Sequence, residues 1–269
     1  MLLEAQGLVR RFGGVVAVDD VSIGVAEGDL VGVIGPNGAG KSTLFHLITG
    51  HLAPDRGRVV LAGRDLGPLS ADQRARAGMA IAFQAVRLFR GMSVLENVMV
   101  GAHAWTSHGF LGAFLQLPAA RREEVQILEA AHAALARVGL SDAADRLAES
   151  LPIGQQRAVQ VARALCGRPK LLLLDEPASG LRGAERERLA TLLEALRDEG
   201  LSMLLIEHDV AFVTRLAGRI TVMDRGRVIA AGTPDEVRRD PAVIGAYLGV
   251  QRARDPAPRE PDPGRTAHA

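Results

Sequence analysis

One segment, GPNGAGKST (35–43), constrains this 269-residue chain more than any other part of its sequence. It fits the pattern G-x-x-x-x-G-K-[ST], follows the apolar run LVGVI (30–34), and precedes a predicted helix over 41–49 that Gly50 ends. Glycines let backbone N–H groups turn toward phosphate oxygens, and a helix N-terminus adds partial positive charge there. The pattern therefore predicts a strand, a phosphate-binding loop and a helix in succession. The predicted phosphate-contacting residues are Gly35, Pro36, Asn37, Gly38, Ala39, Gly40, Lys41, Ser42 and Thr43.

Two side chains of this loop have specific expected roles. Lys41 would contact the β- and γ-phosphates of a bound nucleotide, and the hydroxyl of Ser42 would ligate Mg²⁺. Of the 32 basic residues in the chain only Lys41 and Lys170 are lysines. Lysine therefore stands at the one position where a compact ammonium group is needed among crowded phosphates.

The overall composition excludes several broad classes of protein. The formal net charge of +1 excludes a strongly basic nucleic-acid binder and a self-repelling acidic chain, so we expect no nucleic-acid partner. At 48% hydrophobic residues the chain can bury a large core. Its single cysteine, Cys166, suits a reducing compartment and is expected in the core. No secretory signal and no run of roughly 20 apolar residues is present, so we expect a soluble protein.

Strand-like and helix-like segments alternate along the chain, which favours an α/β fold with a mainly parallel sheet. Two β-rich segments before the phosphate loop, 2–9 and 15–26, predict an N-terminal antiparallel β subdomain. The segment 57–66 resembles a hairpin, and further predicted strands are 79–83, 171–174, 202–207 and 219–223. Further predicted helices are 70–77, with Ser70 as N-cap, 184–199, 210–217 and a short one with Thr233 as N-cap and Pro234 at its first position.

Two regions depart from this alternation. Residues 86–165 have long helical patterns and predict an inserted helical subdomain. Within it, Val125, Leu128, Ala131 or His132, and Leu135 fall on one face of a predicted helix over 121–139. Residues 250–269 are rich in proline and arginine and predict a disordered tail, so we expect the folded domain to span 3–249.

A pair of carboxylates follows a second apolar run, in LLLLDEP (171–177). Asp175 is expected among the ligands of the Mg²⁺, and Glu176 is expected to polarise an attacking water.

Kinases, GTPases, recombination ATPases and transporter ATPases all carry a phosphate loop. A guanine-specific GTPase is unexpected because no N-K-x-D motif is present; the only asparagines are Asn37 and Asn97.

The order of several motifs resembles the nucleotide-binding subunit of an ATP-binding cassette (ABC) transporter over about residues 3–249. Those motifs are the phosphate loop, Gln84 after a strand, LPIGQQR (151–157), LLLLDEP (171–177) and LLIEHD (204–209). Within that family the chain is most similar to the LivG-type ATPases of branched-chain amino acid importers. The segments that carry this closer similarity are FGGVVAVDDVS (12–22), LFRGMSVLENVMVGAH (88–103), the GQQR form of the signature, and PDEVRRDPAVIGAYLG (234–249).

The resemblance implies further site residues. Phe12 stands where the family has an aromatic side chain that stacks on adenine, although a core role is the alternative. Gln84 corresponds to a glutamine that senses Mg²⁺ and the attacking water, and His208 to a histidine that contacts the γ-phosphate. Glu176, His208 and Gln84 are thus the expected catalytic residues, and Ser42, Gln84 and Asp175 the expected metal ligands.

Residues 151–157 correspond to the family signature, whose loop binds the ATP held by a second copy. Gly154 and Gln155 match it and are expected to contact that ATP. Pro152 and Ile153 replace the family's serine and first glycine, and Pro152 lacks both the hydroxyl and an N–H group. The contact in trans is therefore expected to depend on Gly154 and on the dipole of the following helix. Arg182 also departs from the family's Asp or Asn.

One stretch, residues 97–120, has no charged side chain and contains the only tryptophan, Trp105. It either forms a docking face for a membrane subunit or packs within the helical subdomain.

The resemblance implies an ATPase, with ATP and Mg²⁺ as cofactors, that drives uptake of branched-chain amino acids or a related small solute. Its implied partners are a second ABC ATPase subunit, two transmembrane permease subunits and, indirectly, a solute-binding protein. The implied location is peripheral, at the cytoplasmic face of the inner membrane. Alternatives are an ATPase for urea, aromatic-acid or lipopolysaccharide transport, a non-transport cytosolic ABC ATPase, and an idle nucleotide-binding regulator.

Overall fold

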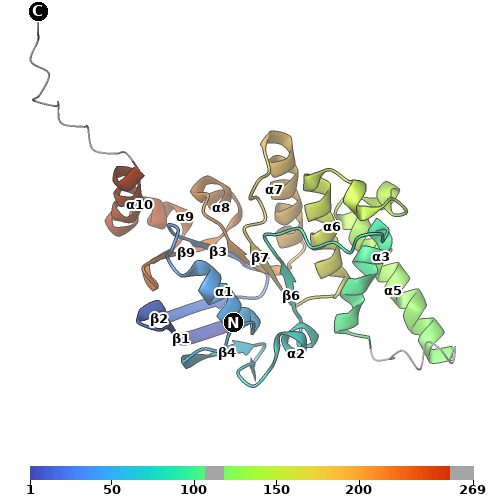
Figure 1. The fold of residues 1–269 in the computed structure, drawn as a ribbon, viewed down its shortest axis with the longest axis horizontal. Coiled ribbons are helices and arrows are strands. Elements are labelled where there is room, and N and C mark those ends of the chain that lie inside the picture. Colours follow the sequence, from blue (N-terminus) through green and yellow to red (C-terminus); the bar gives the residue numbers. More distant parts are fainter. Residues whose placement is uncertain (107–117, 255–269) are drawn as a thin grey trace, which may run out of the picture.

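The computed structural model describes residues 1–106 and 118–254 and has two sheets with helices packed around them (Figure 1). A four-stranded antiparallel sheet has the order β2-β1-β4-β5, and a six-stranded sheet has the order β10-β9-β3-β8-β7-β6. In the larger sheet, β9, β3, β8, β7 and β6 run parallel and β10 is antiparallel to β9. This confirms the predicted α/β fold with a mainly parallel sheet and an N-terminal antiparallel subdomain.

The bounds of the elements agree closely with the sequence predictions. In the smaller sheet the strands are Leu3–Phe12 (β1), Val15–Val25 (β2), Arg56–Leu61 (β4) and Arg64–Asp65 (β5). In the larger sheet they are Leu30–Ile34 (β3), Met79–Ala82 (β6), Leu171–Asp175 (β7), Ser202–Ile206 (β8), Arg219–Asp224 (β9) and Arg227–Gly232 (β10). The helices around them are Lys41–Thr49 (α1), Ala71–Arg76 (α2), Gly183–Asp198 (α7), Val210–Leu216 (α8) and Pro234–Arg239 (α9).

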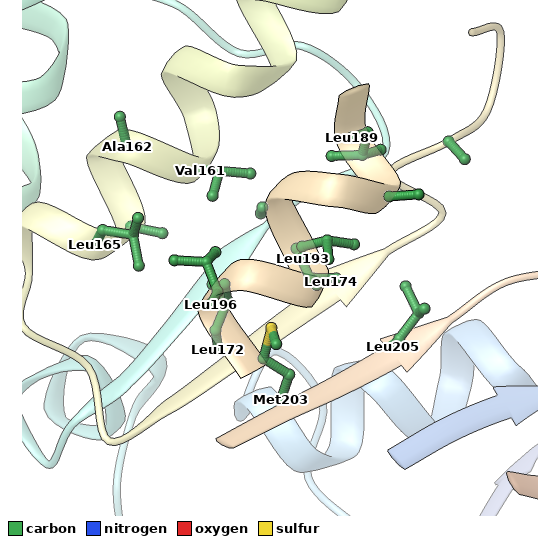
Figure 2. Packing of buried hydrophobic residues seen from close by; sticks show 14 of the residues in the cluster. Val161, Ala162, Leu165, Leu172, Leu174, Leu189, Leu193, Leu196, Met203 and Leu205 are labelled. Atoms are coloured by element: carbon green, nitrogen blue, oxygen red, sulfur yellow. The ribbon is translucent and has the colours of Figure 1, made fainter. Parts of the chain in front are cut away.

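The larger sheet separates two hydrophobic cores, because successive side chains of a strand point to opposite faces. On β3, Leu30 and Ile34 belong to one core while Val31 and Val33 belong to the other. The leucines of β7 alternate in the same way. Figure 2 shows the first core, where side chains of α7 meet those of β7 and β8. The second core lies between the larger sheet, α1 and the antiparallel sheet.

The helical subdomain contains Val94–Met99 (α3), Pro118–Arg137 (α5) and Ile153–Cys166 (α6), and short 3₁₀ turns at Val100–Ala104 (η1), Ser141–Ala143 (η2) and Ala148–Ser150 (η3). The face predicted for α5 is only partly correct. Ala131 and Leu135 are buried, but Val125, Leu128 and His132 are exposed. Ala134 joins the buried set, so the contact face, which meets α3 and α6, is rotated relative to the predicted one.

Trp105 packs inside this subdomain. Its indole Nε1 donates a hydrogen bond to the backbone oxygen of Cys166 at 2.9 Å, and the guanidinium of Arg168 lies 4.3 Å from its ring centre. Cys166 is buried, and burial raises the pKa of its thiol to about 11. Of the two interpretations of the charge-free stretch, packing therefore applies to Trp105, while residues 107–117 lie outside the described part of the chain.

The C-terminal region contains two elements that the sequence patterns did not indicate. Strand β10 adds an antiparallel edge to the larger sheet. Helix α10 (Pro241–Arg254) extends four residues past residue 250, where the predicted tail begins; residues 255–269 lie outside the described residues. The predicted capping of α9 is present, since the Thr233 side chain accepts a hydrogen bond from the N–H of Glu236.

Within the described residues, none of the helices combines the length and the apolar character that a membrane crossing requires.

We expect Gly101→Ala to destabilise the helical subdomain. A Cβ atom at this position of η1 would lie 1.9 Å from the backbone oxygen of Arg163 on α6, so one backbone must move. Overpacking of this kind costs about 1–3 kcal/mol. Urea unfolding measures the change, and Gly218→Ala, where a Cβ would meet nothing within 4 Å, is the control. Equal stability of the two variants would contradict the close approach of η1 and α6.

Candidate functional site

The candidate site forms where the parallel strands of the larger sheet end. In the order β3-β8-β7-β6, neighbouring strands are in register, so their carboxyl ends meet at one edge. β3 leads into the phosphate loop, β8 into His208, β7 into Glu176, and β6 toward Gln84. Segments far apart in sequence are thereby brought together, as expected for ligand sites in open α/β sheets.

Two glycines of the phosphate loop stand where a side chain would collide with neighbouring backbone. At Gly35 a Cβ would lie 2.2 Å from the backbone oxygen of Met223, and at Gly40 it would lie 2.3 Å from that of Ala17. Gly40 also has a φ of 98° and is the N-cap of α1, where no side chain caps the helix. No acidic residue lies in the first turn of α1. The first amides of α1 are thus left for an anion, which suits a phosphate group.

Lys41 lies folded within its own loop. Its Nζ donates to the backbone oxygens of Gly35 at 2.8 Å and of Pro36 at 3.1 Å, and the side chain is buried. Burial lowers the pKa of Lys41, while the charges of Glu176, Asp175 and Glu207 act in the opposite direction. The ammonium group therefore lies in a field of three carboxylates at the strand ends.

Glu176 connects the predicted catalytic residues. Its Oε2 accepts a hydrogen bond from Nε2 of Gln84 at 2.7 Å and lies 3.7 Å from Nδ1 of His208. Its backbone has a φ of 43°, and its N–H donates to the oxygen of Ile206 at 2.8 Å. A non-glycine residue in the left-handed region costs about 1–3 kcal/mol and is found mainly at functional sites. The structure therefore brings Gln84, Glu176 and His208 together.

The predicted metal ligands are of the chemical types that suit a hard divalent cation. Burial and the charge of the neighbouring Glu176 raise the pKa of Asp175, while the charges of His46 and Lys41 act in the opposite direction. Negative charge is thus concentrated at these two carboxylates and is only partly offset. Carboxylate, hydroxyl and amide oxygens from Asp175, Ser42 and Gln84 are the donor types that Mg²⁺ prefers.

A cavity of about 540 Å³ opens over the phosphate loop. Glu176 and residues 37–43 line it, as do residues 15–17 of β2 and Arg225, which the sequence predictions did not include. Phe12 is not among the lining residues. Its ring is half exposed at the end of β1, and the Arg10 guanidinium lies 5.0 Å from the ring centre. The role of Phe12 toward adenine stays a prediction.

The signature loop lies at the N-terminus of α6. Pro152 is the N-cap residue and supplies no side-chain acceptor. Instead, Oε1 of Glu185 on α7 accepts from the N–H of Gly154 at 3.2 Å. The carboxylate of Glu185 thus occupies the position of an anion at the helix N-terminus. A separate cavity of about 300 Å³ borders Pro152, Gly154, Gln155 and Glu185.

Arg182 precedes α7 as its N-cap residue and makes no capping hydrogen bond. An Asp or Asn side chain at an N-cap accepts from the first amides of a helix and stabilises it by about 0.5–2 kcal/mol. The departure from the family pattern therefore removes a cap, and the Arg182 side chain is exposed.

Two buried charged residues near the site were not predicted. Arg157 donates to the backbone oxygens of Gln84 and Ser179. Glu207 accepts from the N–H of Ala178 at 2.8 Å. Arg157 lies within the signature match and Glu207 directly follows an apolar strand, but neither pattern indicates which backbone groups these side chains reach.

Comparisons with known protein families identify the family to which this chain is similar. The sequence profile of the family described as "ABC transporter" matches residues 18–179. A second profile, described as "Branched-chain amino acid ATP-binding cassette transporter", matches residues 227–253. The second match covers β10, α9 and most of α10, and thus includes the two elements, β10 and α10, that the sequence patterns did not indicate.

Among curated proteins, the chain is 43% identical over 249 residues to the high-affinity branched-chain amino acid transport ATP-binding protein LivG of Salmonella typhimurium. That match covers 92% of this chain and 98% of the relative. BraF of Pseudomonas aeruginosa, also a high-affinity branched-chain amino acid transport ATP-binding protein, is 42% identical over the same shares of the two chains. The lipopolysaccharide export system ATP-binding protein LptB of Acidithiobacillus ferridurans is 36% identical.

Solved structures agree with these relatives. MJ1267, an ATP-binding cassette of an ABC transporter, superposes with a TM-score of 0.79 and 32% identity, covering 91% of this chain and 98% of that one. Its ADP conformation gives a TM-score of 0.78. The family profile, the curated relatives and the shared fold lead to one conclusion: this chain belongs to the ABC transporter family, as an ATP-binding subunit.

Proposed function

We propose that this chain binds and hydrolyses ATP to power an ABC importer of branched-chain amino acids or a related small solute. The observation that carries the ATPase assignment is the cluster at the strand ends. Glu176 is hydrogen-bonded to Gln84 and adjacent to His208, beside the cavity over the phosphate loop. The ADP conformation of MJ1267 supports nucleotide binding at this fold.

In the proposed reaction, water attacks the γ-phosphate and ADP leaves. The loop amides and Lys41 hold the phosphates. Glu176 accepts a hydrogen bond from the attacking water, orients it and takes up its proton as the new bond to phosphorus forms. Gln84 and His208 hold the Glu176 carboxylate and the γ-phosphate in place. Ser42, Asp175 and Gln84 would hold Mg²⁺, which, when bound, offsets the negative charge of the phosphates.

The proposed active unit is a pair of ATPase subunits, in which Gly154 and Gln155 of one subunit contact the ATP of the other. Binding closes the pair and hydrolysis reopens it, which drives two permease subunits at the cytoplasmic face of the inner membrane. A solute-binding protein acts indirectly. In this structure the Glu185 carboxylate accepts a hydrogen bond from the Gly154 N–H. The γ-phosphate of the ATP bound to the second subunit must therefore displace this carboxylate to reach the same N–H.

The solute assignment rests on two comparisons. The LivG and BraF relatives are ATP-binding proteins of high-affinity branched-chain amino acid transport, and the C-terminal profile has the same description. The lower identity of LptB makes lipopolysaccharide export a weaker match. Uptake of labelled leucine by cells that express the chain with its permease subunits tests this assignment, and normal uptake after deletion of the chain would contradict it.

We expect Glu176→Gln to bind ATP with nearly unchanged affinity and to hydrolyse it about 100- to 10,000-fold more slowly, because the amide cannot accept a proton from water. Its carbonyl oxygen can still accept the hydrogen bond from Gln84, so the fold is retained. Steady-state phosphate release and nucleotide binding measure the two effects. Glu27→Gln, at an exposed glutamate, is the matched control. Undiminished turnover would remove Glu176 from this role.

Mixing two inactive variants tests whether the site is shared. Lys41→Ala removes the phosphate contact, and Gly154→Asp places a carboxylate at the signature amide. If two copies of this chain form the active pair, a mixture of the variants restores ATPase activity, because one of the two sites then combines an intact loop with an intact signature. Phosphate release from the mixture is compared with each variant alone. Absence of recovery would exclude a functional homodimer and favour a pair with a different ATPase subunit.

A further inference from the structure

Glu207 is a buried carboxylate next to His208 of the candidate site. It follows β8, precedes His208, and is only 1% exposed. Its Oε1 accepts from the N–H of Ala178 at 2.8 Å, and its Oε2 accepts from the N–H of His208 at 3.3 Å. The same Oε2 lies 3.7 Å from Nδ1 of the His208 ring. One side chain therefore contacts both the backbone and the ring of His208, and also the loop after β7.

Placing a carboxylate here is costly. Removing a charge from water is unfavourable unless hydrogen bonds and opposite charges compensate. Burial raises the pKa of Glu207, and its hydrogen bonds to Ala178 and His208 act in the opposite direction. An apolar side chain would avoid this cost, since the residues before it on β8 are all apolar from Met203 to Ile206. Core packing alone therefore does not explain a glutamate at this position.

A buried cation, Arg157, is hydrogen-bonded to the same loop. Arg157 on α6 donates through Nη2 to the oxygen of Ser179 and through Nη1 to the oxygen of Gln84, the latter at 2.9 Å. Adjacent backbone groups of this segment are thus hydrogen-bonded to opposite charges, the Ala178 N–H to the buried Glu207 and the Ser179 oxygen to the buried Arg157. The contacts form a continuous path from Gln84 through Arg157, the loop and Glu207 to His208. Both ends of that path reach Oε2 of Glu176.

We propose that Glu207 is a positioning residue for ATP hydrolysis: it fixes His208 beside Glu176 and ties the segment 178–182 to it. The proposal rests on the proposed ATPase function. A displacement of segment 178–182, which follows the catalytic glutamate, changes the position of the Glu207 carboxylate and therefore the position of the histidine. Glu207 itself is covered by protein and does not face the cavity over the phosphate loop.

Two substitutions in the full-length chain test this proposal. In Glu207→Gln only the amide oxygen can accept, so one of the two backbone contacts is lost. In Glu207→Ala both are lost. We expect kcat to fall about 10-fold for the first and up to about 100-fold for the second, with the affinity for ATP within about threefold of wild type. Glu27→Gln and Glu27→Ala are the matched controls at an exposed site.

A second readout separates positioning from mere stability. In ¹⁵N-labelled protein we expect Glu207→Gln to shift the amide signals of Ala178 and His208, and its loss of kcat to persist when activity is expressed per ATP-binding site. Wild-type kcat in Glu207→Gln would overturn the proposal, as would a loss that disappears after correction for the folded fraction. If Glu207→Ala does not fold, the nearly isosteric glutamine variant decides. Lack of hydrolysis by the wild-type chain would instead refute the proposed ATPase function.

Discussion

The parallel register of β3, β8, β7 and β6 is the constraint on which the site depends. These strands are separated by long stretches of sequence, yet in-register pairing brings their carboxyl ends to one edge of the sheet. The phosphate loop, His208, Glu176 and Gln84 each follow one of them. A slip of one residue would reverse the faces of a strand, so the two cores on either side of the sheet also hold the site in register.

The chemistry at that edge is dominated by charges that are partly or wholly removed from water. The charges of Asp175, Glu176 and Glu207 act on the buried ammonium of Lys41 and raise its pKa against the effect of burial. Buried charges interact more strongly than exposed ones, and each requires hydrogen bonds to offset its desolvation. Glu207 obtains these from backbone N–H groups, and Arg157 donates to backbone oxygens. The loops that carry the predicted catalytic residues are held by these charged side chains as well as by hydrophobic contacts.

The departures at Pro152 and Arg182 have a common structural consequence. Both are N-cap residues, of α6 and α7, and neither supplies a capping side chain. Glu185, in the first turn of α7, instead bonds to the Gly154 amide of α6. The two helices are therefore linked at their N-termini by a hydrogen bond between them, and neither is capped by the side chain of its own N-cap residue.

The sequence by itself determined the features that depend on neighbouring residues. These include the phosphate loop and its helix, the caps at Ser70 and Thr233, the apolar strands, and the order of motifs that identified the family. Local patterns act through backbone conformation and side-chain periodicity, and both can be predicted from a short segment. Only the tertiary structure decided which face of α5 is buried, that Phe12 lies outside the cavity lining, and that Glu207, Arg157 and Glu185 bond to distant backbone groups. Those outcomes depend on which elements pack together, because a charged side chain is compensated by whatever donor or acceptor the fold brings within hydrogen-bonding distance.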